Sequence, residues 1–245
     1  RTPFSEQPVA VVLLLRDGAW VPGVRVESAS FSLTLPAVVN AYTTAVAAER
    51  QSDVVAAVST RAFRPEEDLY LQGLPAAPWT DPAADVRLCV PPDALRPAVD
   101  AAPLSPRWAA SVASPDEGIA AARTIAEAAY TPASSFPVGA LLELNDGTHV
   151  PGVNVEHPDW TRTLCAERCA LGTACSYGLP LADAARLYLT CPNDPEGTPC
   201  GACRQWIAEL TPEATLWMDR HSQAPTAATI ASLLPGSFRG RALLT

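Results

Sequence analysis

The alternation of apolar and polar positions divides the second half of the chain into short, regular segments. Two apolar runs of strand length flank Asn-Asp-Gly at 145–147, a strong signal for a β-hairpin. Apolar residues with helical spacing follow and end at Gly178, a residue type that often closes helices. The pattern predicts strands at 137–144, 149–155, 186–190 and 214–218, and helices at 164–177, 200–210 and 226–234.

A further helix is predicted just before this hairpin. Ser114 is a good N-cap, Pro115 suits the first helical position, and the acidic residues Asp116 and Glu117 complement the helix dipole. The helical pattern continues to Ala129. Helices that alternate with strands in this way predict the α/β class, a three-layer α-β-α domain with a mixed sheet.

The same pattern occurs twice, with a constant offset of 129 residues. The residues DGAWVPGVRVE at 17–27 align with DGTHVPGVNVE at 146–156, and several other blocks match in the same register. Matches in one register over a hundred residues indicate that the α/β domain is duplicated in one chain. We expect a first domain at 1–113 and a second at 114–245, with the Pro- and Ala-rich stretch 91–115 connecting them.

The predicted helix at 114–129 has no counterpart in the first copy, because Arg1 aligns with Tyr130. We therefore expect the natural protein to carry an upstream helix of roughly a dozen residues before Arg1. An initiator Met encoded directly before Arg1 would contradict this expectation.

Composition excludes several classes of function. All 17 basic residues are arginine, so lysine Schiff-base chemistry, PLP attachment and a Walker-A phosphate loop are ruled out. The net charge of −9 argues against nucleic acid or an anionic membrane as a partner, since both are bound by basic surfaces. No apolar run has the length of a membrane span.

The seven cysteines are clustered, with six of them between positions 165 and 203. A disulfide scaffold would be a smaller chain with an even number of cysteines. A reduced, cytoplasmic protein with a metal site fits the clustering better. The other four cysteines are expected to be small buried apolar residues, namely Cys89, Cys169, Cys175 and Cys191.

Three of the cysteines have the positions that a zinc site needs. Cys200 and Cys203 are spaced i, i+3 at the start of a predicted helix, and Cys165 begins another, so helix N-termini favour all three thiolates. Three thiolates suit Zn²⁺ and leave a fourth position for water, which Glu167 can reach as an acid and base. The alternative is a structural zinc with a fourth ligand from Cys169 or Cys191.

Six motifs of the second copy resemble the cytidine deaminase family, and the resemblance covers essentially that whole copy. It implies a zinc-dependent hydrolase of pyrimidine salvage, which converts cytidine and 2'-deoxycytidine to uridine and 2'-deoxyuridine plus ammonia, using a zinc-activated water and Glu167 as proton shuttle. The motifs are Ala129-Tyr-Thr-Pro132, Phe136-Pro-Val-Gly-Ala140, Gly152-Val-Asn-Val-Glu156, Cys165-Ala-Glu167, Pro199-Cys-Gly-Ala-Cys203-Arg-Gln205 and Leu233-Leu-Pro-Gly-Ser-Phe238.

The resemblance also implies roles for residues around the zinc. Arg168 would hydrogen-bond the ligand sulfurs, with help from Gln205, and Phe238 would contribute to a site in a neighbouring domain or subunit. The implied substrate contacts are Phe136 on the base, Asn154 and Glu156 on the ribose hydroxyls, the N–H of Ala166 on the 2-oxo group and the carbonyl of Thr198 on the leaving amine.

The chain departs from its relatives after Glu156, where it reads His157-Pro-Asp-Trp160 in place of Asn-Ala-Ser-Tyr. We interpret His157 as a rim residue, with the ribose or another subunit as alternative contacts, and Trp160 as interface or core packing. His149 and His221 have no ligand spacing and are expected in surface or turn positions. These departures affect the choice of substrate rather than the reaction.

The first copy lacks the chemical residues. With the offset of 129, Pro36 replaces Cys165, Val38 replaces Glu167, and Glu27 remains as a relic or a salt-bridge residue. The first copy is therefore predicted to be a non-catalytic scaffold or partner. The resemblance to small deaminases that form tetramers implies that this two-domain chain forms a homodimer with four such domains. The remaining replacements in this register are Val39 for Arg168, Leu71 and Leu74 for Cys200 and Cys203, and Arg25 for Asn154.

Two other functions remain open. One alternative is a zinc-bearing relative without turnover, which would bind zinc or nucleoside but release no ammonia in a cytidine assay. The other is a deaminase of another aminopyrimidine nucleoside, such as a nucleoside antibiotic, although Phe136, Asn154 and Glu156 favour ordinary ribonucleosides. A polynucleotide editor is disfavoured by the negative charge and the absence of lysine.

Overall fold

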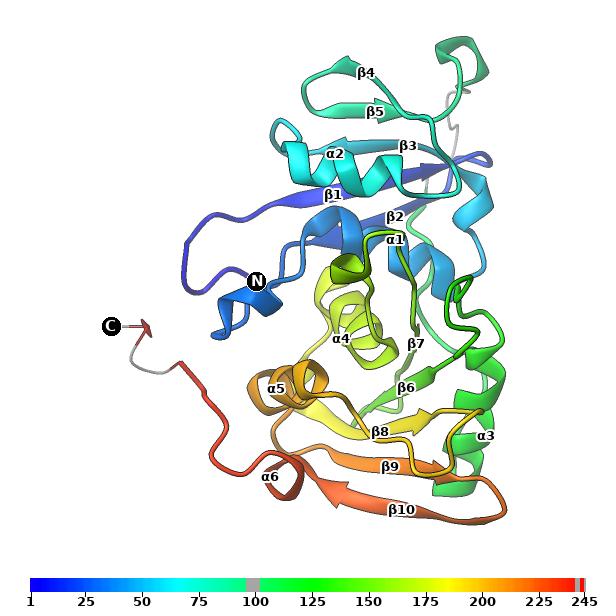
Figure 1. Ribbon diagram of the computed structural model, residues 1–245, viewed down its shortest axis with the longest axis vertical. Coiled ribbons are helices and arrows are strands. Elements are labelled where there is room, and N and C mark those ends of the chain that lie inside the picture. Colours follow the sequence, from blue (N-terminus) through cyan, green and yellow to red (C-terminus); the bar gives the residue numbers. More distant parts are fainter. Residues whose placement is uncertain (96–101, 241–242, 245) are drawn as a thin grey trace.

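The computed structural model describes residues 1–95, 102–240 and 243–244, and it contains two five-stranded sheets in the orders β2-β1-β3-β5-β4 and β10-β9-β8-β6-β7 (Figure 1). The strands are β1 Ala10–Leu15, β2 Trp20–Val24, β3 Val54–Ser59, β4 Thr80–Ala83, β5 Val86–Leu88, β6 Gly139–Leu144, β7 His149–Val153, β8 Ala184–Thr190, β9 Thr215–Arg220 and β10 Gln223–Thr229. The α-helices are α1 Ala37–Ala47, α2 Pro65–Gln72, α3 Pro115–Ala126, α4 Ala166–Ser176, α5 Gly201–Leu210 and α6 Ile230–Leu233.

The predicted duplication is visible in the boundaries of the elements. β6, β7 and α4 each begin and end 129 positions after β1, β2 and α1. The offset then grows, because the loop before β8 is one residue longer than the loop before β3, and the loop before α5 is longer again. Arg64 caps α2 as Cys200 caps α5, so Arg64 and Glu67 take the helix positions of Cys200 and Cys203. The predicted replacements, Leu71 and Leu74, are corrected accordingly.

The second half has the predicted three layers. Two glycines allow helices to approach the sheet on both faces: a Cβ on Gly139 would lie 2.1 Å from the Ala122 carbonyl oxygen of α3. A Cβ on Gly152 would lie 2.2 Å from the Ala166 carbonyl oxygen of α4 on the other face. The fold class is therefore confirmed, with β8 and β9 parallel in an otherwise antiparallel sheet.

The first sheet differs from the second in its strand directions. All of its described strand pairs are antiparallel, because β5 and not β4 pairs with β3. A mixed sheet is thus a property of the second half. The two halves share α/β architecture up to α2 and α5, and then diverge.

The prediction of a helix over 226–234 is wrong for its first part. Residues Gln223–Thr229 form the edge strand β10 paired with β9, and only Ile230–Leu233 is helical. The strand is mostly exposed and consists of small and polar residues, so it shows no apolar alternation. Its position is set by the tight turn after β9, where His221 has a φ of 56°.

The two halves pack through α1 and α4, which lie between the two sheets (Figure 1). Thr44 Oγ1 contacts its own counterpart, Thr173 Oγ1, at 2.7 Å. Asn40 Nδ2 donates to the Gly172 carbonyl at 3.1 Å, and the equivalent Cys169 thiol donates to the Thr43 carbonyl at 3.4 Å. Equivalent residues contact one another, so this interface has the self-complementary form of a two-fold dimer within one chain.

Part of the predicted connection 91–115 pairs with both halves. Leu104 N–H donates to the Trp20 carbonyl at 2.8 Å, and Trp108 N–H donates to the His149 carbonyl at 2.9 Å. Residues 96–101 of this connection lie outside the described residues. Among the helices that are described, none combines the length and apolar character needed to cross a membrane.

Candidate active site

Three cysteine sulfurs meet where two helices begin. Cys165 is the N-cap of α4, Cys200 is the N-cap of α5, and Cys203 lies in the first turn of α5. The Sγ atoms of Cys165 and Cys200 are 3.6 Å apart, and those of Cys200 and Cys203 are 3.5 Å apart. Zinc–sulfur bonds of about 2.3 Å in tetrahedral geometry separate sulfurs by about 3.8 Å, so the sulfurs fit a zinc ion.

A four-cysteine structural site is not supported by this geometry. Within the described part of the chain, the Cys165, Cys200 and Cys203 cluster is the one group of metal-ligating side chains found. Cys169 is buried and donates instead to the Thr43 carbonyl, and Cys191 lies outside the cluster. Three ligands leave a position for water, as in catalytic zinc sites.

The environment of the sulfurs favours negative charge at the centre of the cluster. Hydrogen bonds of Cys200 with the Cys165 and Cys203 side chains, and with the N–H groups of Cys203 and Ala202, lower the pKa of Cys200. The same sharing of one negative charge raises the pKa of Cys165 and of Cys203. A divalent cation would replace these shared protons and bind all three sulfurs as thiolates.

Glu167 lies beside the cluster, in the first turn of α4, and is 3% exposed. Burial raises its pKa to about 7. Its carboxyl lines a cavity of about 330 Å³ together with Cys165 and Cys200. A buried carboxyl that gains and loses its proton near neutral pH is suited to moving protons in a reaction.

Asn154 and Glu156 line the same cavity from the segment that follows β7. Asn154 accepts from the Val138 N–H at 2.8 Å and donates to the Phe136 carbonyl at 2.9 Å, which fixes the segment before β6 that carries Phe136. Burial opposes ionisation of Glu156, but Ser134 Oγ and the N–H groups of Ala133 and Ser134 outweigh it and lower its pKa. Glu156 therefore presents an anionic hydrogen-bond acceptor to the cavity.

Phe136 and Thr198 also line the cavity, whereas Ala166 is the buried first residue of α4. The N–H of Ala166 belongs to the first turn, where backbone donors have no partner within the helix. The structure thus brings together the predicted zinc ligands, Glu167 and the predicted substrate-binding residues.

The other predicted residues have different neighbours. Arg168 donates to the Leu33 carbonyl of the first half at 2.8 Å, and its guanidinium lies 4.9 Å from the centre of the Trp206 ring. Gln205 donates to Glu209 Oε1 at 2.6 Å and to the Phe238 carbonyl. No hydrogen bond from Arg168 or Gln205 to a ligand sulfur is found in the described structure, so their roles around zinc remain predictions. The Phe238 residue is 56% exposed.

Three further residues, not predicted from the sequence, hold the segments around the cavity in place. Ser134 binds Glu156, and its signal was available, because Ser5 holds the same position in the first copy and binds Glu27 in the same way. Arg204 binds the Pro199 carbonyl at 2.8 Å and Thr198 Oγ1 at 3.0 Å. Arg220 binds the Gly197 carbonyl at 3.0 Å, and no local pattern marks it.

The structure corrects the positions that were predicted for two histidines and narrows the prediction for Trp160. His157 is 7% exposed and contacts the first half, so it is not a rim residue. His149 is buried and not on the surface, while His221 lies in the turn after β9 as expected. Trp160 is 62% exposed and lines the cavity, which excludes core packing.

The corresponding positions in the first half have no such chemistry. Pro36 is the N-cap of α1 and Val38 is fully buried behind it. Glu27 accepts from Ser5 and the N–H groups of Phe4 and Ser5, as Glu156 does from its own loop, and it also pairs with Arg25 at 3.1 Å. The hydrogen bonds that hold this carboxylate are retained without a ligand cluster beside it.

Several known proteins are similar to part of this chain. The family model described as "Cytidine and deoxycytidylate deaminase zinc-binding region" matches residues 114–218. A cytidine deaminase from Sporosarcina psychrophila is 41% identical over 123 residues, which cover 49% of this chain and 88% of the relative. One from Halalkalibacterium halodurans is 39% identical, covering 46% of this chain and 84% of the relative. A crystal structure of cytidine deaminase from Burkholderia pseudomallei has a TM-score of 0.48 and 35% identity, covering 50% of this chain and 98% of that one.

Proposed function

The chain belongs to the cytidine deaminase family, and we propose that its second half hydrolyses cytidine and 2'-deoxycytidine to uridine and 2'-deoxyuridine plus ammonia. The observation that carries this proposal is the buried Glu167 in one cavity with sulfurs spaced for zinc. The enzyme is a zinc-dependent hydrolase that breaks the C–N bond of a cyclic amidine.

Cys165, Cys200 and Cys203 would hold the zinc ion, in agreement with the family model for a zinc-binding region. When bound, zinc supplies a water molecule whose pKa is lowered toward neutrality. The helix N-termini at Cys165 and Cys200 offset part of the excess negative charge of three thiolates. Arg168, next to Glu167, is proposed to offset more of it.

Glu167 moves the protons of the reaction. It takes a proton from the attacking water, passes one to the ring N3, and later protonates the amine that leaves from C4. Water supplies the oxygen of the new carbonyl, and the amino group departs as ammonia. The near-neutral pKa of Glu167 suits both directions of transfer.

The cavity walls orient the nucleoside. We assign Asn154 and Glu156 to the ribose hydroxyls, because both line the cavity and Glu156 is an ionised acceptor. Phe136 packs against the base, the Ala166 N–H binds the 2-oxo group, and the Thr198 carbonyl faces the leaving amine. A volume of about 330 Å³ suits a small ligand of nucleoside size.

We propose that residues 1–113 form a non-catalytic domain and that residues 114–245 form the catalytic domain. We further propose that two chains assemble into a homodimer. The support for a dimer is a pair of exposed aromatic side chains at equivalent positions, Phe31 at 88% and Trp160 at 62% exposure. Phe238, also exposed, is proposed to reach a site in a neighbouring domain or subunit. The mass of the particle in solution tests this, and an active monomer would contradict it.

We place the enzyme in the cytoplasm, in pyrimidine salvage. All seven cysteines are free thiols, which persist in a reducing compartment. The three cysteines proposed to bind zinc must also remain reduced, because a disulfide sulfur would not bind the ion. Free nucleosides, rather than nucleic acid or a membrane, are the partners that a chain of net charge −9 suits.

A substrate panel with the zinc-loaded full chain tests the proposal. Cytidine, 2'-deoxycytidine and a base-modified aminopyrimidine nucleoside are each compared for ammonia release. The expected result is turnover of the first two. Turnover of the modified nucleoside alone would overturn the assignment of substrate, and no turnover of any of them would overturn the assignment as an enzyme.

A further inference from the structure

The segment 157–164 connects the proposed ribose-binding Glu156 to the zinc ligand Cys165, and it forms one wall of the cavity. Trp160, Thr163 and Leu164 of this segment line the cavity. Their placement decides the shape of the space that receives the nucleoside. We call residues 157–164 the substrate loop.

Two contacts attach the substrate loop to α2 of the first half. His157 Nε2 lies 3.0 Å from the Tyr70 carbonyl oxygen, and the His157 and Tyr70 rings stack with centres 5.0 Å apart. Arg162, at the end of the loop, donates to the Glu66 carbonyl oxygen one turn earlier on the same helix. The loop is thus held at both ends by one helix of the non-catalytic half.

The hydrogen bonds of His157 fix its tautomer. Nδ1 accepts from the Asp159 N–H at 3.0 Å, so the proton of the neutral ring is on Nε2, which donates to the Tyr70 carbonyl. Both ring nitrogens have partners inside the protein. The ring therefore links the turn of the substrate loop directly to the backbone of α2.

Gly73, at the end of α2, provides the space for this ring. A Cβ at Gly73 would lie 2.2 Å from His157 Nε2. The backbone of Gly73, with φ of −83°, is accessible to any residue, so the missing side chain serves the fit of His157 and not the local conformation.

The equivalent contact, between the loop of the non-catalytic half and α5, is made by different residues. Counting from the helix caps, Gly73 corresponds to Glu209 on α5. Glu209 accepts from Ser28 Oγ at 2.8 Å and from the Ala29 N–H at 2.9 Å, and Ser28 is the counterpart of His157. A carboxylate thus holds the loop of the non-catalytic half, whereas the loop of the catalytic half is held by a histidine beside a glycine.

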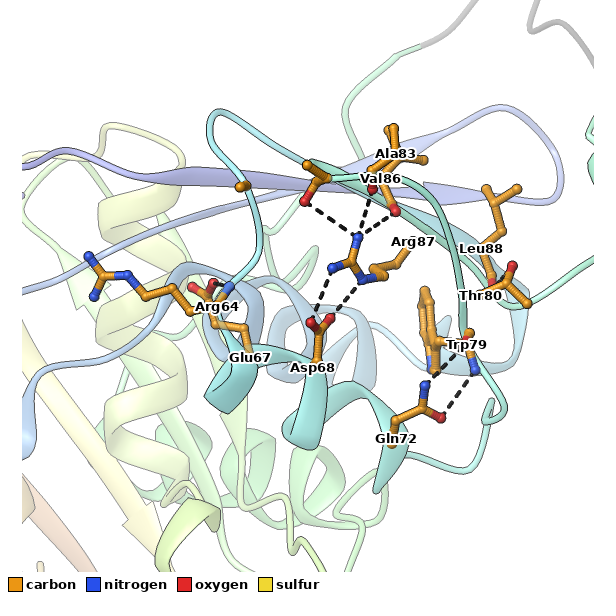
Figure 2. A network of polar contacts seen from close by, with 12 residues as sticks. Arg64, Glu67, Asp68, Gln72, Trp79, Thr80, Ala83, Val86, Arg87 and Leu88 are labelled. Carbon is orange, nitrogen blue, oxygen red and sulfur yellow. Dashed lines mark hydrogen bonds and ion pairs between the residues drawn. The ribbon is translucent and has the colours of Figure 1, made fainter.

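Helix α2 is held in turn by polar contacts with the β4–β5 hairpin and the segment just before it (Figure 2). The buried Arg87 donates to Asp68 at 2.7 and 3.1 Å and to the carbonyl oxygens of Ala83 and Val86, each at 2.8 Å. Gln72 exchanges hydrogen bonds with the Trp79 backbone. These contacts join α2 to the β4–β5 hairpin and make it a rigid support.

We infer that α2 of the non-catalytic half positions the substrate loop, with His157 as the positioning residue seated between Tyr70 and Gly73. The inference rests on the proposed function, since the loop it positions lines the nucleoside cavity. It gives the non-catalytic half a specific task in substrate binding. His157 acts on the nucleoside through the loop and not by contact.

The test is the variant Gly73→Ala, assayed as the zinc-loaded full chain. The added methyl group must displace His157, so KM for cytidine is expected to rise about fivefold, the equivalent of one hydrogen bond of about 1 kcal/mol, while kcat and zinc content stay near wild type. Ser28→Ala, which removes the equivalent contact of the other loop, is the matched control and is expected to retain the wild-type KM. An unchanged KM in Gly73→Ala, or a loss of zinc in it, would overturn the inference.

Two further measurements separate positioning from general destabilisation. His157→Ala removes the same contact, so the double variant Gly73→Ala, His157→Ala is expected to raise KM no more than either single variant. Additive effects would contradict the inference.

Hydrogen exchange without nucleoside is independent of the reaction. Exchange of the amides of 159–164 is expected to accelerate in Gly73→Ala and not in Ser28→Ala. If the wild type failed to deaminate cytidine, the proposed function would fail, and equal exchange in Gly73→Ala and wild type would separately refute the loop contact.

Discussion

Asp219 lies behind the active site, on β9, where it ties α3 to the sheet. It accepts from Arg123 Nε at 2.7 Å, from Thr190 Oγ1 at 2.7 Å and from the His221 N–H at 2.8 Å, and it is 4% exposed. Burial alone would raise its pKa, but these donors outweigh burial and lower the pKa from 3.8 to about 2. Replacement by Asn removes the charge while keeping the shape.

The lowered pKa sets the sign and the size of the effect on stability. A carboxyl with a lower pKa in the folded state stabilises the protein above the unfolded pKa and loses that contribution as pH falls through the folded pKa. At about 1.4 kcal/mol for each pKa unit, Asp219 contributes about 2 kcal/mol at neutral pH, and about half of it is lost by about pH 3.

Urea unfolding of wild type and Asp219→Asn, followed by tryptophan fluorescence, measures this contribution. The difference in free energy of unfolding between the two proteins is expected to be about 2 kcal/mol larger at pH 7 than at about pH 2. Because each comparison is made at one pH, other titrating groups cancel. An equal difference at both pH values would refute the linkage between the Asp219 charge and its donors.

Three other substitutions, one of them with a matched control, test the metal site and the packing. Cys200→Ser is expected to lower zinc content by more than tenfold, measured by metal analysis after dialysis, because it removes the ligand that contacts both other sulfurs. Gly152→Ala should destabilise the fold by about 1–3 kcal/mol in urea unfolding, since its Cβ would lie 2.2 Å from the Ala166 carbonyl oxygen, whereas Gly201→Ala, which meets nothing within 4 Å, should not. Arg87→Met should cost about 1–2 kcal/mol by the same assay, because it leaves three carbonyls without their donor and removes the partner of the partly exposed Asp68 carboxylate.

The features that could be predicted from the sequence are those that require particular residue types at neighbouring positions. The hairpin at 145–147 and the helix end at Gly178, with φ of 67°, follow from turn and cap preferences. The i, i+3 spacing of Cys200 and Cys203 at a helix start is equally local. The duplication was detectable because the offset of 129 is constant through α1 and α4.

What the sequence could not show depends on contacts between distant residues. β10 has small and polar residues, so pairing with β9 and not an apolar pattern makes it a strand. The shift in register after α1 and α4 arises from loop lengths, which carry no periodicity. The burial of His157 against Tyr70 joins residues 87 positions apart, so no pattern around His157 indicates it.

The central claim is that Glu167 moves protons for the hydrolysis of cytidine at a zinc site made by three cysteines. The most direct measurement is ammonia released per uridine formed by the zinc-loaded full chain, in wild type and in Glu167→Gln. One ammonia per uridine is expected in wild type, with turnover lower by about 10²–10⁴ in Glu167→Gln at unchanged zinc content. Wild-type turnover in Glu167→Gln, or no ammonia from the zinc-loaded wild type, would contradict the claim.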